Sequence, residues 1–209
     1  MSERATLRSG GIIGIAWVLI AFGAIFLGSG SRPTEFLELV ASGLSLWWVV
    51  SLWSYMRSHE SGSGGLSTLF LVGWTIALTV EVISYAIGAM QAARPQDSLA
   101  IGTYVNNSRE FLNLASNIPL AAALIGAGLA MWVRHAFPRW IAALGLITGL
   151  AMFSLSLPLV VDLSLLTDTG VIFALTQLAF VIWLISVSIV MILKSSGALQ
   201  KADGSATTV

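Results

Sequence analysis

Six long apolar stretches, each close to twenty residues, constrain this chain more than any other feature. A helix that crosses the hydrocarbon core of a bilayer needs ~20 mostly apolar residues. Short polar breaks rich in Gly, Ser, Pro and Arg separate the stretches. The sequence therefore predicts an all-α polytopic membrane bundle of about six helices, a single domain over residues 1–209 with a polar tail at 195–209. The expected helices are 11–28, 36–56, 66–90, 111–133, 140–159 and 171–193.

The composition supports a membrane location and narrows the classes of partner. Hydrophobic residues make up 56% of the chain and charged residues 10%, whereas soluble domains carry roughly 25% charged residues. The formal net charge is zero, so no basic field would attract nucleic acid. We expect membrane lipid and other integral membrane proteins as partners, and the oligomeric state stays open.

Basic residues predict the orientation of the helices. Alternate threading places seven on one side of the membrane and three on the other, and basic loops favour the cytoplasm. Both termini are therefore expected on the cytoplasmic side of the membrane, which we expect to be the cell inner membrane. The apolar run that follows Arg8 is long for a secretory signal, so an uncleaved first helix is expected. The seven are Arg4, Arg8, Arg57, Arg134, Arg139, Lys194 and Lys201; the three are Arg32, Arg94 and Arg109.

Glu81 is the clearest candidate for a functional residue, because ionisable groups inside a bilayer are costly and point to function. It lies in the third apolar stretch, about 5 Å from its centre near Leu78 at 1.5 Å per residue. Four polar residues of the expected fourth helix recur at spacings of four, three and four, which places them on one face. They are Asn106, Glu110, Asn113 and Asn117.

These residues suggest a polar cavity in the outer half of the bundle. Tyr85, Asn113 and Asn117 are expected in one layer with Glu81, and Glu38 and Asp162 approach it from the second and fifth helices. The cavity would open to the non-cytoplasmic side. The alternative is that these groups only hydrogen-bond neighbouring helices and fix their register, with Arg109 and Glu110 marking a helix boundary.

Several kinds of site are not expected. The chain has no cysteine, which excludes thiolate catalysis and cysteine metal sites. Both histidines, His59 and His135, fall in expected loops, so a bis-histidine haem inside the bundle is not expected. No metal-ligand spacing or nucleophile–base pair is present. No cofactor, metal or catalytic residue is therefore predicted.

The start of the fifth stretch carries a family resemblance. Residues 137–150, FPRWIAALGLITGL, resemble the PRW…LGL…G motif of a bacterial family of uncharacterised six-helix membrane proteins. Glu81 falls where that family often has a glutamate, although Leu78 and Thr79 stand where it often has an arginine. The resemblance implies a bacterial inner-membrane protein and implies no activity.

Three functions follow as hypotheses. The first is a non-catalytic accessory or scaffold subunit that packs against other membrane proteins, lipid or pigment. The second is a small transporter or receptor that uses the polar cavity around Glu81 and Asn117. The third, an intramembrane enzyme, has the least support because no acid–base pair can be named.

Overall fold

The computed structural model describes residues 3–26, 32–60, 62, 64–93, 99–157 and 169–196. These residues form six α-helices and no strand. The prediction of an all-α, six-helix bundle is therefore confirmed. The helices are α1 (Glu3–Phe26), α2 (Arg32–His59), α3 (Gly65–Ala93), α4 (Leu99–Arg134), α5 (Arg139–Leu155) and α6 (Thr169–Ser195).

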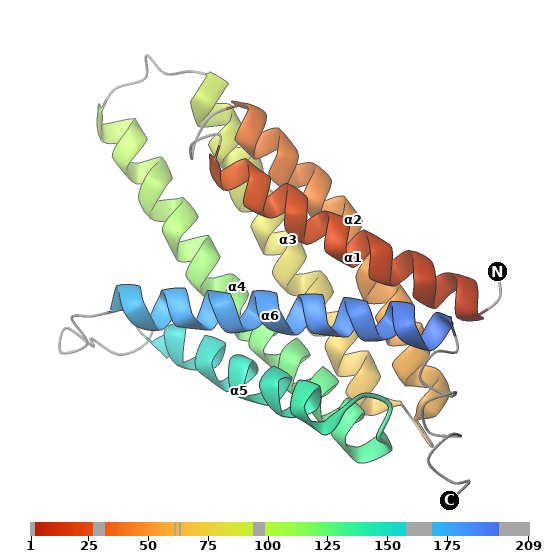
Figure 1. The fold of residues 1–209 in the computed structure, drawn as a ribbon. Helices are drawn as coiled ribbons and strands as arrows, with labels where there is room; N and C mark the ends of the chain where they lie inside the picture. Colours follow the sequence, from red (N-terminus) through yellow and green to blue (C-terminus); the bar gives the residue numbers. More distant parts are fainter. Residues whose placement is uncertain are drawn as a thin grey trace, which may run out of the picture.

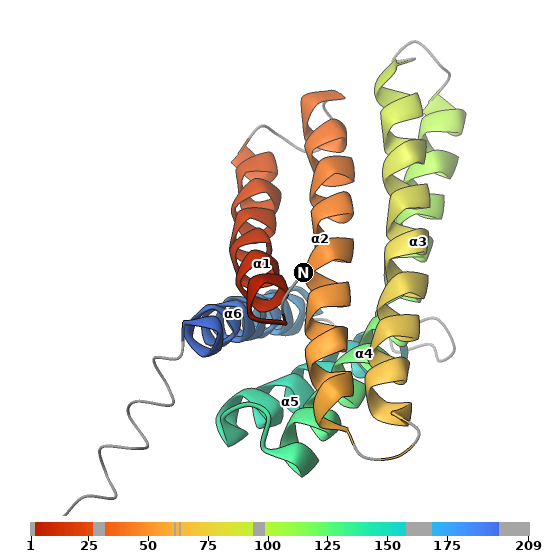
Figure 2. The ribbon, with the colours of Figure 1, turned by 90° about the vertical axis from the view of Figure 1, so that its right-hand side faces the viewer.

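Consecutive helices run in alternate directions, and the last two cross the others (Figure 1). Figure 2 shows α2, α3 and α4 standing upright, with α5 and α6 lying across their lower part. We call the end of the bundle where α1 begins and α6 finishes the inner end. The outer end is where α2 and α4 begin. The outer half of α4 thus extends beyond α5 and α6 (Figures 1 and 2).

Five of the described helices, α1, α2, α3, α4 and α6, are long and apolar enough to cross a membrane. The described part of α5 is apolar but has only 17 residues. The chain is thus a multi-pass membrane protein by the length and composition of its helices.

A cluster of aromatic rings forms the core where α1, α2, α3 and α6 meet. Trp48 lies at its centre, fully buried, and its ring centroid is 5.3 Å from that of Trp74 and 5.9 Å from those of Trp17 and Trp183. The Trp48 indole N–H donates to the Ser188 hydroxyl at 3.0 Å, which satisfies a buried polar group. Trp48 is therefore a packing residue of the core. Phe70 and Phe180 complete the cluster.

Close helix contact at α1 explains why Gly10 and Gly14 are spaced as GxxxG. A Cβ atom on Gly14 would lie 2.3 Å from the Trp48 ring and 2.4 Å from the Ser188 hydroxyl. Gly10 faces Ser51 in the same way. Small residues at such positions let helix backbones approach, so this pattern serves contacts inside the bundle.

The largest difference from the expected helices concerns α4. It begins at Leu99 rather than Phe111 and has 36 residues, so the expected start was wrong. Hydropathy alone excluded the polar turns around Arg109, yet these turns pack on α3 and remain helical. Pro119, inside α4, does not end it. Asp162, which was expected to approach the polar cavity, and most of the polar tail lie outside the described residues.

Candidate functional site

An ion pair joins α2 to α4 near the outer end. The Arg109 guanidinium donates to both oxygens of the Glu35 carboxylate, at 2.9 and 3.2 Å. The Glu35 side chain is 2% exposed and that of Arg109 is 22% exposed. A buried carboxylate needs such a partner, because an unpaired buried charge is strongly destabilising.

Gly88 of α3 provides the space for this ion pair. A Cβ atom there would lie 2.5 Å from the Arg109 Cζ and 2.5 Å from a Glu35 carboxylate oxygen. The three residues therefore meet at one point, where α3 lies between α2 and α4. Any larger residue at position 88 would displace the charged groups.

Two further carboxylates lie beside the ion pair. The Tyr85 hydroxyl donates a hydrogen bond to Glu38, and Glu38 also feels the charges of Glu35, Arg109 and Glu81. Among the described residues, neither Glu38 nor Glu81 forms an ion pair of its own. We call Glu35, Glu38, Glu81, Tyr85 and Arg109 the outer polar cluster.

The outer polar cluster continues the core-facing side of α3. Trp74, Glu81 and Gly88 follow one another at seven-residue intervals, which keeps them on one side of a helix. Trp74 is 3% exposed in the aromatic core, whereas Glu81 is only half-buried. The cluster therefore lies directly outside the aromatic core and spans about 5 to 15 Å from the centre of α3 at 1.5 Å per residue.

The polar stripe predicted on α4 also continues a core-facing side. Asn113 and Asn117 precede Leu120 and Leu124 at spacings of four, three and four. Both leucines are buried. Asn113, in contrast, is exposed, as are Asn106 and Glu110. We call these three exposed residues, Asn106, Glu110 and Asn113, the α4 polar face.

The exposure of the α4 polar face has a structural cause. The Ser156 hydroxyl, at the end of α5, bonds the Leu114 carbonyl at 3.4 Å, so α5 accompanies α4 no farther outward than Leu114. The three residues of the α4 polar face lie farther out than Leu114 and are exposed. The same side of one helix is thus apolar and buried in the inner half, and polar and accessible in the outer half.

Two buried polar groups near this region have no hydrogen-bond partner among the described residues. The first is the Nε–H of Arg109, which is buried and makes no hydrogen bond within the described part of the chain. Ser84, one turn from Glu81 and Gly88, is fully buried and its hydroxyl is likewise unpaired. Unpaired buried polar groups cost about 1–3 kcal/mol each, so both are unusual at this place.

The structure brings some of the predicted site residues together and separates others. Glu38, Glu81 and Tyr85 come together, as proposed from the sequence. Glu110 and Asn113 lie on the exposed α4 polar face, and Asn117 is buried at the middle of α4. Asp162 lies outside the described residues.

Sequence reasoning missed Glu35 and the role of Arg109. One of the two interpretations left open by the sequence placed Arg109 at a helix boundary, but its side chain reaches inward to Glu35. The seven-residue spacing of Glu35, Ser42 and Val49 could have placed Glu35 on the core side of α2. Nothing in the sequence pairs it with Arg109, since that depends on how α3 and α4 pack.

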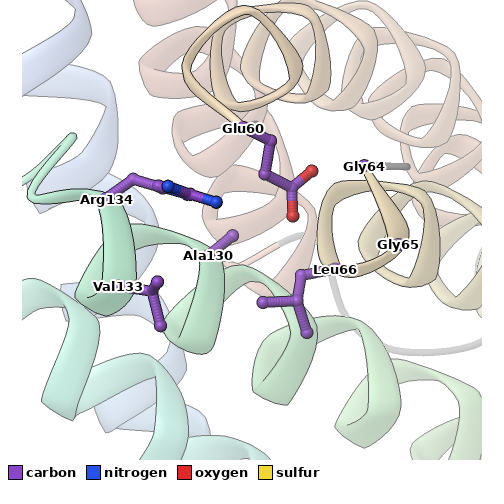
Figure 3. Close-up of a pocket in the computed structure, with 7 residues that line it drawn as sticks. All are labelled: Glu60, Gly64, Gly65, Leu66, Ala130, Val133 and Arg134. Carbon is purple, nitrogen blue, oxygen red and sulfur yellow. The ribbon is translucent and has the colours of Figure 1, made fainter. Parts of the chain in front are cut away.

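A separate hollow of about 300 Å³ lies at the inner end, between the start of α3 and the end of α4. The side chains of Glu60 and Arg134 both extend over it (Figure 3). The Glu60 carboxylate accepts hydrogen bonds from the backbone N–H and the hydroxyl of Ser67. Glu60 thereby caps α3, so its charge stabilises the start of a helix.

Comparisons with known proteins add no assignment: no family model, no curated protein and no solved structure matches the chain. Membership of the family suggested by the PRW motif therefore stays a prediction. The inference about function must come from the geometry of the outer polar cluster and the α4 polar face.

Proposed function

We propose that the protein is a small transporter or receptor of a bacterial inner membrane that binds a solute in the outer half of its helix bundle. One observation carries this proposal. Three carboxylates of α2 and α3 gather with a single guanidinium beside a core-facing helix side that is polar and uncovered. Charged groups inside a membrane face the bundle interior or water and mark substrate pathways.

A purely structural role for the outer polar cluster explains less. The Glu35–Arg109 pair would by itself join α2 to α4. It gives no reason for Glu81, which has no hydrogen-bond or ion-pair partner among the described residues. It also gives no reason for the polar continuation of the α4 core side. A solute or water at this place accounts for both.

The orientation proposed with this function has both termini in the cytoplasm. The charges of the described helices support it, since more basic residues lie toward the inner end than near the outer end. Those toward the inner end are Arg4, Arg8, Arg57, Arg134, Arg139 and Lys194, and those near the outer end are Arg32 and Arg109. Basic residues favour the cytoplasmic side. The outer polar cluster would then open away from the cytoplasm.

Cysteine accessibility tests the proposed function directly, because the chain has no cysteine of its own. Asn113→Cys would place a thiol on the α4 polar face. Phe111→Cys would place one at nearly the same depth on another side of α4, where Phe111 is 60% exposed. Thiolates are the reactive form, and a thiol in lipid does not ionise.

We expect a charged, membrane-impermeant thiol reagent to modify Asn113→Cys from the non-cytoplasmic side at least ten times faster than Phe111→Cys. Equal, slow modification of both variants would mean that no aqueous path reaches the α4 polar face, and would overturn the proposal. Modification from the cytoplasmic side alone would overturn the orientation.

The accessory-subunit hypothesis rests on the exposed apolar helix faces, such as Ile147 and Leu150 of α5 at 63% and 62% exposure. Lipid covers such faces as well as a partner protein does, so they favour neither function. Native mass spectrometry after mild extraction distinguishes the two. A fixed complex with larger membrane proteins would favour the subunit, whereas a free chain with a bound small molecule would favour the transporter or receptor.

A further inference from the structure

The charge balance of the outer polar cluster indicates the sign of its ligand. Arg109 is the only basic residue in the cluster, and its positive charge is balanced by the Glu35 carboxylate, to which it donates two hydrogen bonds. Glu38 and Glu81 are left without an ion pair among the described residues. Two carboxylates in a low-dielectric region attract positive charge, so an anionic ligand is disfavoured and a cationic one favoured.

The uncharged polar groups around the cluster indicate that it holds a ligand and not only a counter-ion. Ser84 is fully buried and its hydroxyl has no hydrogen-bond partner in the described ranges, and Asn117 is 7% exposed. Asn117 lies on the core-facing side of α4, and Ser84 lies one turn from both Glu81 and Gly88. An amide and a hydroxyl can each accept a hydrogen bond, so a donor placed among these helices could bond to either.

The spacing of the carboxylates distinguishes between kinds of cation. A metal ion such as Ca²⁺ or Mg²⁺ needs several oxygen ligands that converge on one point. Within the described residues no three acidic or histidine side chains come close enough for that. An organic ammonium ion, in contrast, carries several N–H donors and an apolar body, so it can bridge groups that lie farther apart.

The apolar surroundings suit the body of such an ion. Tyr85 is half-buried beside Glu38, and aromatic faces attract alkylammonium groups. Trp74 lies two turns below Glu81 on the same side of α3. We propose that the ligand of the outer polar cluster is a small organic ammonium ion whose nitrogen binds between the Glu38 and Glu81 carboxylates. This inference rests on the proposed function and specifies its ligand class.

Ligand-dependent stabilisation tests the inference on the full chain in detergent. A ligand that binds only the folded state raises the unfolding temperature in a saturable way. The probe is n-butylammonium chloride, compared with sodium chloride at equal ionic strength and with n-butanol, which has the same body without the charge. We expect a saturable rise for n-butylammonium only, and a half-saturating concentration at least ten times higher in Glu81→Gln.

The matched control is Glu3→Gln, which removes a carboxylate from an exposed position at the inner end and should leave the titration unchanged. If Glu81→Gln does not fold, Glu38→Gln replaces it with the same expectation. A second readout does not depend on stability: n-butylammonium should slow the modification of Asn113→Cys at least threefold.

Three results would overturn the inference. An equal effect of sodium would indicate an inorganic cation or simple ionic strength, and an equal effect of n-butanol would indicate partitioning into apolar surface. No effect of any probe, with Asn113→Cys still open to the aqueous reagent, would reject an ammonium ligand and leave the proposed function standing. If the aqueous reagent does not reach Asn113→Cys even when no ligand is added, the proposed function itself is rejected.

Discussion

Replacing Arg109 by methionine should destabilise the protein more than any other change to one of its charged side chains. The variant keeps an unbranched apolar stem but leaves Glu35, 2% exposed, without a cation. Two unit charges ~4 Å apart attract by about 4 kcal/mol at an effective dielectric constant of 20. Loss of one partner of a buried pair costs about 3–5 kcal/mol in measured cases. We therefore expect a loss of about 3–5 kcal/mol in the free energy of unfolding.

The companion variants make this expectation specific. Glu35→Met should cost less, because Arg109 is partly exposed and remains within the field of Glu38. The double variant Glu35→Met/Arg109→Met should recover most of the loss, because replacing both partners by apolar groups is often neutral or stabilising. Arg139→Met, at an exposed position of the inner end, is the matched control and should change stability by less than about 0.5 kcal/mol.

Reversible unfolding in mixed micelles of increasing SDS fraction is followed by the circular dichroism of the helices. It gives the free energy of unfolding of the parent chain and of each variant. The coupling between the two sites follows from a double-mutant cycle. A loss below about 1 kcal/mol for Arg109→Met, or additive losses in the double variant, would refute the argument that a buried ion pair holds α2 to α4.

Two further predictions concern the packing of α1 and the aromatic core. Gly14→Ala should cost about 1–3 kcal/mol, because its Cβ would overlap Trp48 and Ser188. Gly43→Ala, with nothing within 4 Å of its Cβ, should be neutral or stabilising by up to about 1 kcal/mol in the same unfolding assay. Equal losses would contradict the close helix contact. Trp48→Phe should cost about 1–3 kcal/mol by leaving Ser188 unpaired, whereas Trp47→Phe, at a position 45% exposed, should cost less than about 1 kcal/mol. A larger loss for Trp47→Phe than for Trp48→Phe would contradict the position of the aromatic core.

The sequence predicted the helices well where hydropathy and helix boundaries coincide. The apolar stretches that became α3 and α6 were placed within a few residues. The start of α4 could not be found in this way, because the turns around Arg109 are too polar for a hydropathy argument. They are helical because they pack on α3 and because Arg109 forms an ion pair with Glu35. Both contacts depend on how α2, α3 and α4 pack together.

The candidate site was predicted in part for a similar reason. Periodicity placed Asn113 and Asn117 on one side of α4, and the depth of Glu81 marked it as unusual. Periodicity gives the side of a helix but not the neighbour that covers it. The ending of α5 near Leu114 decides that Asn117 is buried and Asn113 exposed, and no local pattern of residues encodes that.

The contact between α1 and α6 determines when the bundle can be completed during synthesis. A Cβ atom on Gly11 would lie 2.6 Å from the Ser188 carbonyl oxygen, so the two helices fit closely although about 175 residues separate them. A ribosome that adds 5–20 residues per second would make Ser188 roughly 10 to 35 s after Gly11. The glycine side of α1 must therefore stay in lipid, or against a chaperone or insertase, until the last helix enters the membrane. The first helix made is thus among the last to reach its final packing.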